Sequence, residues 1–295
     1  MDPFTRTVER TYHRPVLVLC LEGWIDAGLG AGAALAALIG SRTTEEVALW
    51  DADEFIDHRA RRPVLHLSDG VATGLTWPEI RLLGATDDDG NDLLLLTGPE
   101  PDMRWHAFSD SVVGLATSLG VRLAVGLGAF PAPVPHTRPV NLVSTAPSTE
   151  LAQEVGFIPG SIDVPAGVQA VLETDLNTAG VPAVGLWARV PHYVVSMPYP
   201  AASAALIDGL ASIAGLRLSS RDLHDAAARA RVRIDELIAN SDEHRAMVAQ
   251  LEAQSERDST VEGTTLGTGM GAGPLPSGDE IAAELERFLR GDGSP

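Results

Sequence analysis

Short apolar runs alternate with helix-like stretches over much of the chain. Residues 15–21 form a continuous apolar run of strand length, and Asp26 can cap a following helix that reaches residue 39. Residues 46–50 predict the next strand. A strand, a helix and a strand in this order indicate a parallel sheet with a crossover helix.

The middle of the chain adds a hairpin and more alternating elements. Strands at 79–85 and 92–97 flank the acidic stretch 87–90, which predicts a hairpin with a solvated turn and an antiparallel edge of the sheet. The remaining elements are expected as strands at 63–67, 121–127 and 183–190, and as helices at 103–119, 168–178 and 201–214. The proline-rich segment 129–147 is expected to be a loop.

The composition changes near residue 219, which predicts an appended helical part. We expect an α/β core over 14–218, a charged helical extension over 219–258, a flexible Gly/Thr/Pro linker over 259–277 and an amphipathic helix over 278–291. The apolar stripe of that last helix consists of Ile281, Leu285, Phe288 and Leu289. Such a stripe needs a surface to cover, which the chain's own body, a neighbouring subunit or a foreign partner can supply.

Charge and composition exclude several classes of function. The net charge of −19 opposes binding to nucleic acid and to anionic membranes. All 21 basic residues are arginine, so a Schiff-base lysine and the phosphate-binding lysine of a P-loop are excluded. The single cysteine, Cys20, lies in an apolar run, which predicts no disulfide framework and fits a reducing cytoplasm. No leader or membrane-spanning segment is expected.

One glycine-rich motif suggests a cofactor. Residues 28–33 match G-x-G-x-x-A, and Asp51 follows at the distance typical of a ribose-binding acid. The motif begins too far beyond the preceding strand, so we interpret its glycines as helix positions that allow close packing on the sheet. We predict no cofactor, and no histidine pair has the helical spacing of a metal site.

Three polar cassettes follow apolar strands, where α/β proteins usually assemble a site or an interface. They are Gly23-Trp24-Ile25-Asp26-Ala27-Gly28, Asp57 to Pro63 and Pro135-His136-Thr137-Arg138-Pro139. The candidate polar cluster comprises Asp26, Asp57, Arg59, Arg62, His136, Arg138 and His192, and the motif turn comprises Gly23, Trp24 and Gly28. Two interpretations stay open: an ion-pair network that pins loops or a subunit interface, which we favour, and an anion pocket with His136 or His192 as proton donor.

The cassettes, taken in order, resemble the proteasome assembly chaperone 2 (PAC2) family, and more closely its actinobacterial branch. The matching segments are 23–28, 57–63, 98–102 and 134–140, followed by Val190-Pro191-His192-Tyr193 and the arginine-rich C-terminal helices. The resemblance spans about residues 14 to 290. It implies a three-layer α/β/α sandwich with a largely parallel sheet, similar to phosphorylase/hydrolase-type folds, and a tendency to self-associate. An association of the family with ATP-grasp enzymes does not fit a chain without lysine.

The resemblance also implies a function. Relatives help to assemble the proteasome, docking on its α-ring through a hydrophobic–tyrosine–any tail, whereas this chain ends in Gly293-Ser294-Pro295, which puts that docking route in doubt. The leading hypothesis is a noncatalytic homo-oligomer that is chaperone-like toward the proteasome or another assembly. The alternative is an enzyme or binder of a small anionic metabolite that bears phosphate or carboxylate.

Overall fold

The structure is a computed structural model that describes residues 3–8, 10–146, 152, 156–157, 161 and 163–262, with side chains described up to residue 257. Helix α8 continues to Glu262. The rest of the predicted linker 259–277 and the predicted helix 278–291 lie outside the described residues.

Strands and helices follow the predicted alternation. The strands are β1 (Phe4–Arg6), β2 (Val16–Glu22), β3 (Glu45–Trp50), β4 (Val64–Ser68), β5 (Val71–Thr76), β6 (Arg81–Thr86), β7 (Asp92–Pro99), β8 (Leu123–Ala132), β9 (Leu142–Thr145) and β10 (Ala183–Pro191). The α-helices are α1 (Gly30–Gly40), α2 (Ala52–Phe55), α3 (Trp105–Ser118), α5 (Val168–Thr178), α6 (Pro200–Ala214), α7 (Arg221–Ala239) and α8 (Asp242–Glu262), with short 3-10 helices η1 (Ala27–Leu29) and η2 (His192–Val194).

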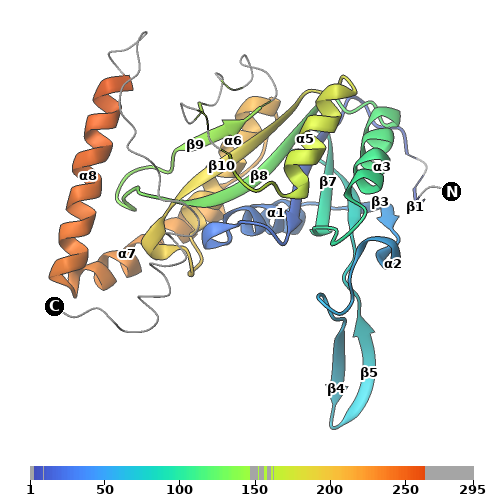
Figure 1. Cartoon of the computed structure of the whole chain (residues 1–295), viewed down its shortest axis with the longest axis horizontal. Coiled ribbons are helices and arrows are strands. Elements are labelled where there is room, and N and C mark those ends of the chain that lie inside the picture. Colours follow the sequence, from blue (N-terminus) through green and yellow to red (C-terminus); the bar gives the residue numbers. More distant parts are fainter. Residues whose placement is uncertain are drawn as a thin grey trace. The chain divides into compact units, whose positions relative to one another are not determined.

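Eight strands form the main sheet in the order β1-β3-β6-β7-β2-β8-β10-β9 (Figure 1). Its centre, β7-β2-β8-β10, is parallel, and antiparallel pairs extend it on both sides. The hairpin β6–β7 is confirmed. Strands β2 and β3 run parallel, as the crossover inference predicted, but they are not neighbours in the sheet. Strands β6 and β7 lie between them.

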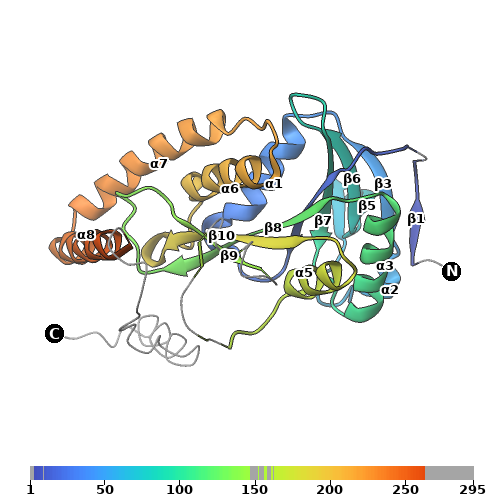
Figure 2. The same cartoon turned by 90° about the horizontal axis from the view of Figure 1, so that it is seen from above.

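Helices cover both faces of this sheet, which confirms the three-layer α/β/α fold. Figure 2 shows α1 and α6 on one side and α3 and α5 on the other. Strand β2 explains the division, because Val16 and Val18 pack in the α1/α6 core whereas Leu17 and Leu19 pack in the α3/α5 core. A strand buried on both faces reads as a continuous apolar run, and the sequence of β2 has that form.

The predicted C-terminal helical part is present as α7 and α8. Helix α7 lies on α6, and its residue Ile234 is buried in the α1/α6 core. The chain forms one compact unit up to Ala253, and the described part of a second unit is the end of α8 from Gln254.

The predicted strand at 63–67 does form, but outside the main sheet. It is β4, which pairs only with β5 in a separate two-stranded sheet (Figure 1). Every residue of both strands is exposed. The sequence analysis missed β5, because Gly74 and the polar residues around it interrupt its apolar pattern.

Two further expectations were wrong. The segment 129–147 is not all loop, since β8 continues to Ala132 and β9 spans Leu142–Thr145. The acidic turn is not fully solvated, since Asp87 is buried and accepts hydrogen bonds from the backbone N–H groups of Arg217 and Asn91 at 2.8 and 2.7 Å. Burial alone would raise the pKa of Asp87, but these hydrogen bonds outweigh it and lower the pKa.

Candidate functional site

The polar cassettes of the sequence lie along one edge of the sheet. Strands β2, β7, β8 and β10 are parallel, and they end at Glu22, Pro99, Ala132 and Pro191. Residues 23–28, 98–102, 134–140 and 190–193 therefore meet at the carboxyl edge of the sheet, where ligand sites of open α/β folds occur.

The first cassette is a tight turn fixed by Asp26. The carboxylate of Asp26 accepts the backbone N–H groups of Ala31 and Gly32 at 2.8 and 2.9 Å, so it caps α1 as predicted, across the intervening η1 turn. Gly28 has a φ of 64° and packs so closely on Tyr199 that a Cβ would clash. Trp24 and Leu29 on the same turn are exposed.

The glycines of this turn serve packing, as predicted. A Cβ on Gly30 would lie 2.8 Å from Ala129 of β8 and 3.1 Å from Ala202 of α6, so this position requires glycine for close contact. Gly28, in contrast, lies in η1 and not in α1.

The second cassette forms a loop held by Asp102. The carboxylate of Asp102 accepts the backbone N–H of Asp57 at 2.9 Å and pairs with Arg61 at 3.2 Å. The guanidinium of Arg61 also covers Gly23, which joins the second cassette to the first. The side chains of Arg59 and Arg62 are exposed. The ion pair of this loop therefore joins Arg61 to Asp102, and neither residue was in the predicted cluster.

The third cassette contacts the C-terminal helices through its buried His136 and the half-buried Thr137, whereas Arg138 and Pro139 are exposed. The hydroxyl of Tyr193 accepts the backbone N–H of His136 at 2.8 Å and lies 2.8 Å from its Nδ1, while Nε2 lies 2.9 Å from Asp235 of α7. This network assigns the proton of a neutral imidazole to Nε2, which donates to Asp235, while Tyr193 donates to Nδ1. The neighbouring Thr137 donates to Glu252 of α8.

The candidate residues therefore have different partners and different surroundings. Asp26 caps α1, Asp57 is bound by Asp102, and His136 joins η2 to α7. His192 is exposed and contacts the Tyr193 ring edge-on, and Arg138 is also engaged by a neighbouring group. The sequence signalled Tyr193 only as part of the PAC2 pattern, and it gave no signal for Asp235, which lies 99 residues from His136.

A buried carboxyl group also escaped the sequence analysis. Glu173 of α5 accepts hydrogen bonds from Gln169 at 2.9 Å and Thr145 at 3.0 Å. Gly126 and Gly185 leave room for it, since a Cβ on either would lie within 2.6 Å of its carboxylate. Burial raises the pKa of Glu173 to about 7, and the two hydrogen bonds offset part of that rise. Helical spacing predicted α5 itself but not the opposing glycines.

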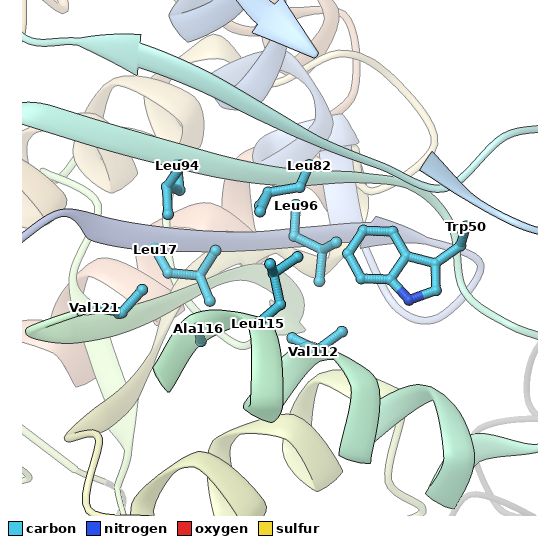
Figure 3. Close-up of a pocket in the computed structure, with 9 residues that line it drawn as sticks. All are labelled: Leu17, Trp50, Leu82, Leu94, Leu96, Val112, Leu115, Ala116 and Val121. Carbon is cyan, nitrogen blue, oxygen red and sulfur yellow. The ribbon is translucent and has the colours of Figure 1, made fainter. Parts of the chain in front are cut away.

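A small void lies in the interior of the described chain. Figure 3 shows nine residues around it, among them Leu94, Val112 and Trp50, at the α3 face of the sheet. Its volume of about 10 Å³ and its apolar lining suit neither a metabolite nor a bound water. Within the described residues, no group of three or more His, Cys, Asp or Glu side chains is placed to hold a metal ion. No described helix is long and apolar enough to cross a membrane.

The fold and the loops at the carboxyl edge of the sheet define the class of the protein. It is a three-layer α/β/α protein in which these loops bind mainly one another and the C-terminal helices. The family model of the PAC2 family matches residues 20–238. The chain belongs to the PAC2 family, as the cassettes indicated.

Solved structures agree with this assignment. A Mycobacterium tuberculosis protein of unknown function is 35% identical, with a TM-score of 0.80 over 88% of this chain and 91% of that one. A proteasome-assembly chaperone homologue from the same organism is 34% identical, with a TM-score of 0.74 over 80% and 99% of the two chains.

A more distant neighbour shares the fold alone. The archaeal proteasome activator PbaB of Pyrococcus furiosus is 15% identical, with a TM-score of 0.61 over 80% of this chain and 99% of that one. Among proteins with curated functions, no match was found.

Proposed function

We propose that this chain is a noncatalytic protein that self-associates through its β4–β5 hairpin and acts as a chaperone-like partner of proteasome components in the cytoplasm. The observation that carries the proposal is the exposed apolar surface of that hairpin.

The hairpin presents one leucine-rich face. Leu65 pairs with Leu75 and Leu67 with Ala72, so these four side chains point to the same side. The three leucines are each more than half exposed. An isolated two-stranded hairpin is marginally stable in water, and a stable one needs a covering partner for its apolar face. Every copy of the chain meets other copies that carry the same exposed surfaces, which favours self-association.

The carboxyl edge supports a noncatalytic role. Both ring nitrogens of His136 have partners, Asp26 is used as a helix cap, and Arg61 is paired with Asp102. An anion pocket needs convergent cations with unused donors around a cavity. The exposed Arg59 and Arg62 belong to a loop that is held separately from His136.

Related proteins suggest the proteasome as the partner. A protein 34% identical to this one is described as a proteasome-assembly chaperone homologue. The hairpin, in which Asp69 is the only Asp, Glu, Lys or Arg, and the acidic remainder of the chain suit a protein partner far better than a polyanion.

The first experiment measures mass in solution. Multi-angle light scattering of the full chain should give a multiple of 31.0 kDa. The triple variant Leu65→Ser/Leu67→Ser/Leu75→Ser should dissociate to the single-chain mass with an unchanged far-UV circular dichroism spectrum. The matched control is Val232→Ser/Leu237→Ser, because these α7 residues are equally exposed. A monomeric parent chain at all concentrations would refute self-association.

The second experiment concerns the partner. The full chain, purified, is mixed with a purified proteasome core particle and with its separate α subunits, and co-elution is measured by gel filtration. Co-elution with the α subunits supports the chaperone-like role. Absence of binding to both the core particle and the α subunits would leave self-association intact and refute the proteasome partner.

A further inference from the structure

The chain carries a second exposed apolar surface besides the hairpin, on the turn that follows β2. We infer that this turn, with Trp24, Ile25 and Leu29, is the receiving site for the β4–β5 hairpin of a second copy of the chain. The inference rests on the proposed self-association and adds the surface that the hairpin contacts.

The backbone of the turn gives the first argument. Leu29 has a φ of 55°, a left-handed conformation that is costly for a branched apolar residue. The same residue exposes 58% of its surface, so packing within the described part of the chain compensates little for this strain. A strained residue that projects a leucine into solvent is expected where a partner covers it.

The turn is also rigid. Asp26 fixes it to α1, and the backbone of Gly28 exchanges hydrogen bonds with the 190s segment, donating to Val195 at 3.0 Å and accepting from Tyr199 at 2.8 Å. Trp24 lies against Gly167 at the start of α5. A preorganised apolar surface binds with little ordering cost, which suits a docking site better than a mobile loop does.

The distribution of charge favours the hairpin as the element that covers this turn. Between Pro63 and Trp77, Asp69 is the only Asp, Glu, Lys or Arg. The chain as a whole carries a charge of −19, so two copies repel unless they meet through an uncharged element. The strands of the hairpin are such an element, because Asp69 lies in the turn between them, and their leucines match the apolar side chains of the turn at 23–29.

The arrangement within one chain favours a hairpin that comes from another copy. Arg61, just before β4, covers Gly23, so the base of the hairpin starts beside the turn. Figure 1 shows the hairpin extending away from the main sheet. Its leucines and the turn are all exposed in the single chain, so the hairpin does not cover its own turn. Two different surfaces that complement each other make a heterologous contact, which closes into a ring when the rotation allows it.

Cross-linking tests the contact directly. Differently tagged copies carrying Leu67→Cys and Leu29→Cys are co-expressed and treated with a short bis-maleimide. The native Cys20 is buried, which raises the pKa of its thiol to about 12 and keeps it unreactive. We expect a product that contains both tags. The matched control pairs Leu67→Cys with Leu237→Cys, which is as exposed as Leu29 at 58% but lies on α7.

A second variant separates docking from folding. Leu29→Gly removes the apolar side chain and relieves the left-handed strain, so the fold should be kept or stabilised. Association should nevertheless weaken roughly tenfold or more, because one buried leucine side chain is lost at the interface. The readout is the dissociation constant from sedimentation equilibrium.

The outcomes distinguish this inference from the proposed function. A two-tag product above the control, together with weaker association of Leu29→Gly, supports the docking site. Cross-links only between two Leu67→Cys copies, or unchanged association of Leu29→Gly, would overturn it and leave hairpin-dependent self-association standing. A monomeric parent chain would overturn both.

Discussion

Strand β7 and the β4–β5 hairpin are built from the same kind of residue and have opposite surroundings. Leu93, Leu94, Leu95 and Leu96 of β7 are completely buried, because helices cover both faces of the main sheet. Leu65, Leu67 and Leu75 of the hairpin are exposed, because no layer of the described chain lies over them. An apolar strand thus indicates that a surface will be covered, but its sequence does not say whether the same chain covers it.

The largest expected effect is a difference in stability between substitutions in β7 and in the hairpin. Leu95→Ala removes a fully buried side chain and should lower the free energy of unfolding by about 2–5 kcal/mol, through lost burial and a new cavity. Leu75→Ala in the hairpin should change the stability of the isolated monomer by less than about 0.5 kcal/mol. Urea unfolding, followed by tryptophan fluorescence at low protein concentration, measures both.

The same pair of variants has the reverse effect on assembly. Leu75→Ala should weaken association, while Leu95→Ala should leave the dissociation constant unchanged as long as the protein is folded. If Leu75→Ala destabilises the monomer as strongly as Leu95→Ala does, the hairpin is covered within the chain and the comparison fails.

The contrast also explains how far the sequence predicted the fold. The run at 15–21, the helix after Asp26 and the hairpin at 79–97 were predictable, because each depends on local apolar spacing or turn residues. The order of the strands was not, since β6 and β7 insert between β2 and β3 through long-range pairing. Strand β9 was missed because its four residues follow a proline-rich stretch.

The candidate site was predictable in position but not in partners. Placing polar residues after apolar strands located the carboxyl edge correctly. Asp26 was correctly identified as a cap because that contact is local. The partners of His136 and Arg61, which are Asp235 and Asp102, come from distant elements and follow only from the fold.

A smaller effect concerns charge inside the buried region. Glu173 has a pKa of about 7 instead of 4.5, so the folded protein holds a proton that the unfolded chain releases between these values. Its contribution to stability is therefore greatest below pH 4.5, falls as the pH rises toward 7 and is constant above that. The full difference corresponds to roughly 3 kcal/mol.

Glu173→Gln removes this titration and should flatten the dependence of unfolding free energy on pH between 4.5 and 7. The variant should be more stable than the parent at pH 8, because the amide needs no proton to remain neutral. The exposed Glu243→Gln on α8 is the control and should keep the slope of the parent. Equal slopes for parent and Glu173→Gln would contradict the prediction.

The smallest effect tests the turn at 23–29, which combines features of both regions: its side chains are exposed like those of the hairpin, while its backbone is fixed like that of the sheet. Asp26 provides that fixation by accepting two backbone N–H groups of α1. Asp26→Ala should cost about 1–2 kcal/mol of stability, because both donors lose their partner. Thermal unfolding of the monomeric Leu65→Ser/Leu67→Ser/Leu75→Ser background measures this cost without a contribution from assembly.

Asp26→Asn is the matched comparison, because its amide oxygen can keep one of the two hydrogen bonds. It should retain about half of the lost stability, and in the otherwise unchanged chain it should also retain more of the association than Asp26→Ala does. A loosened turn loses the preorganisation that makes the exposed Trp24 and Leu29 a docking surface, so cap strength and association should fall together. If Asp26→Ala lowers the stability but leaves the association unchanged, the turn is rigid for the sake of α1 alone, and the hairpin remains the only exposed apolar element that assembly requires.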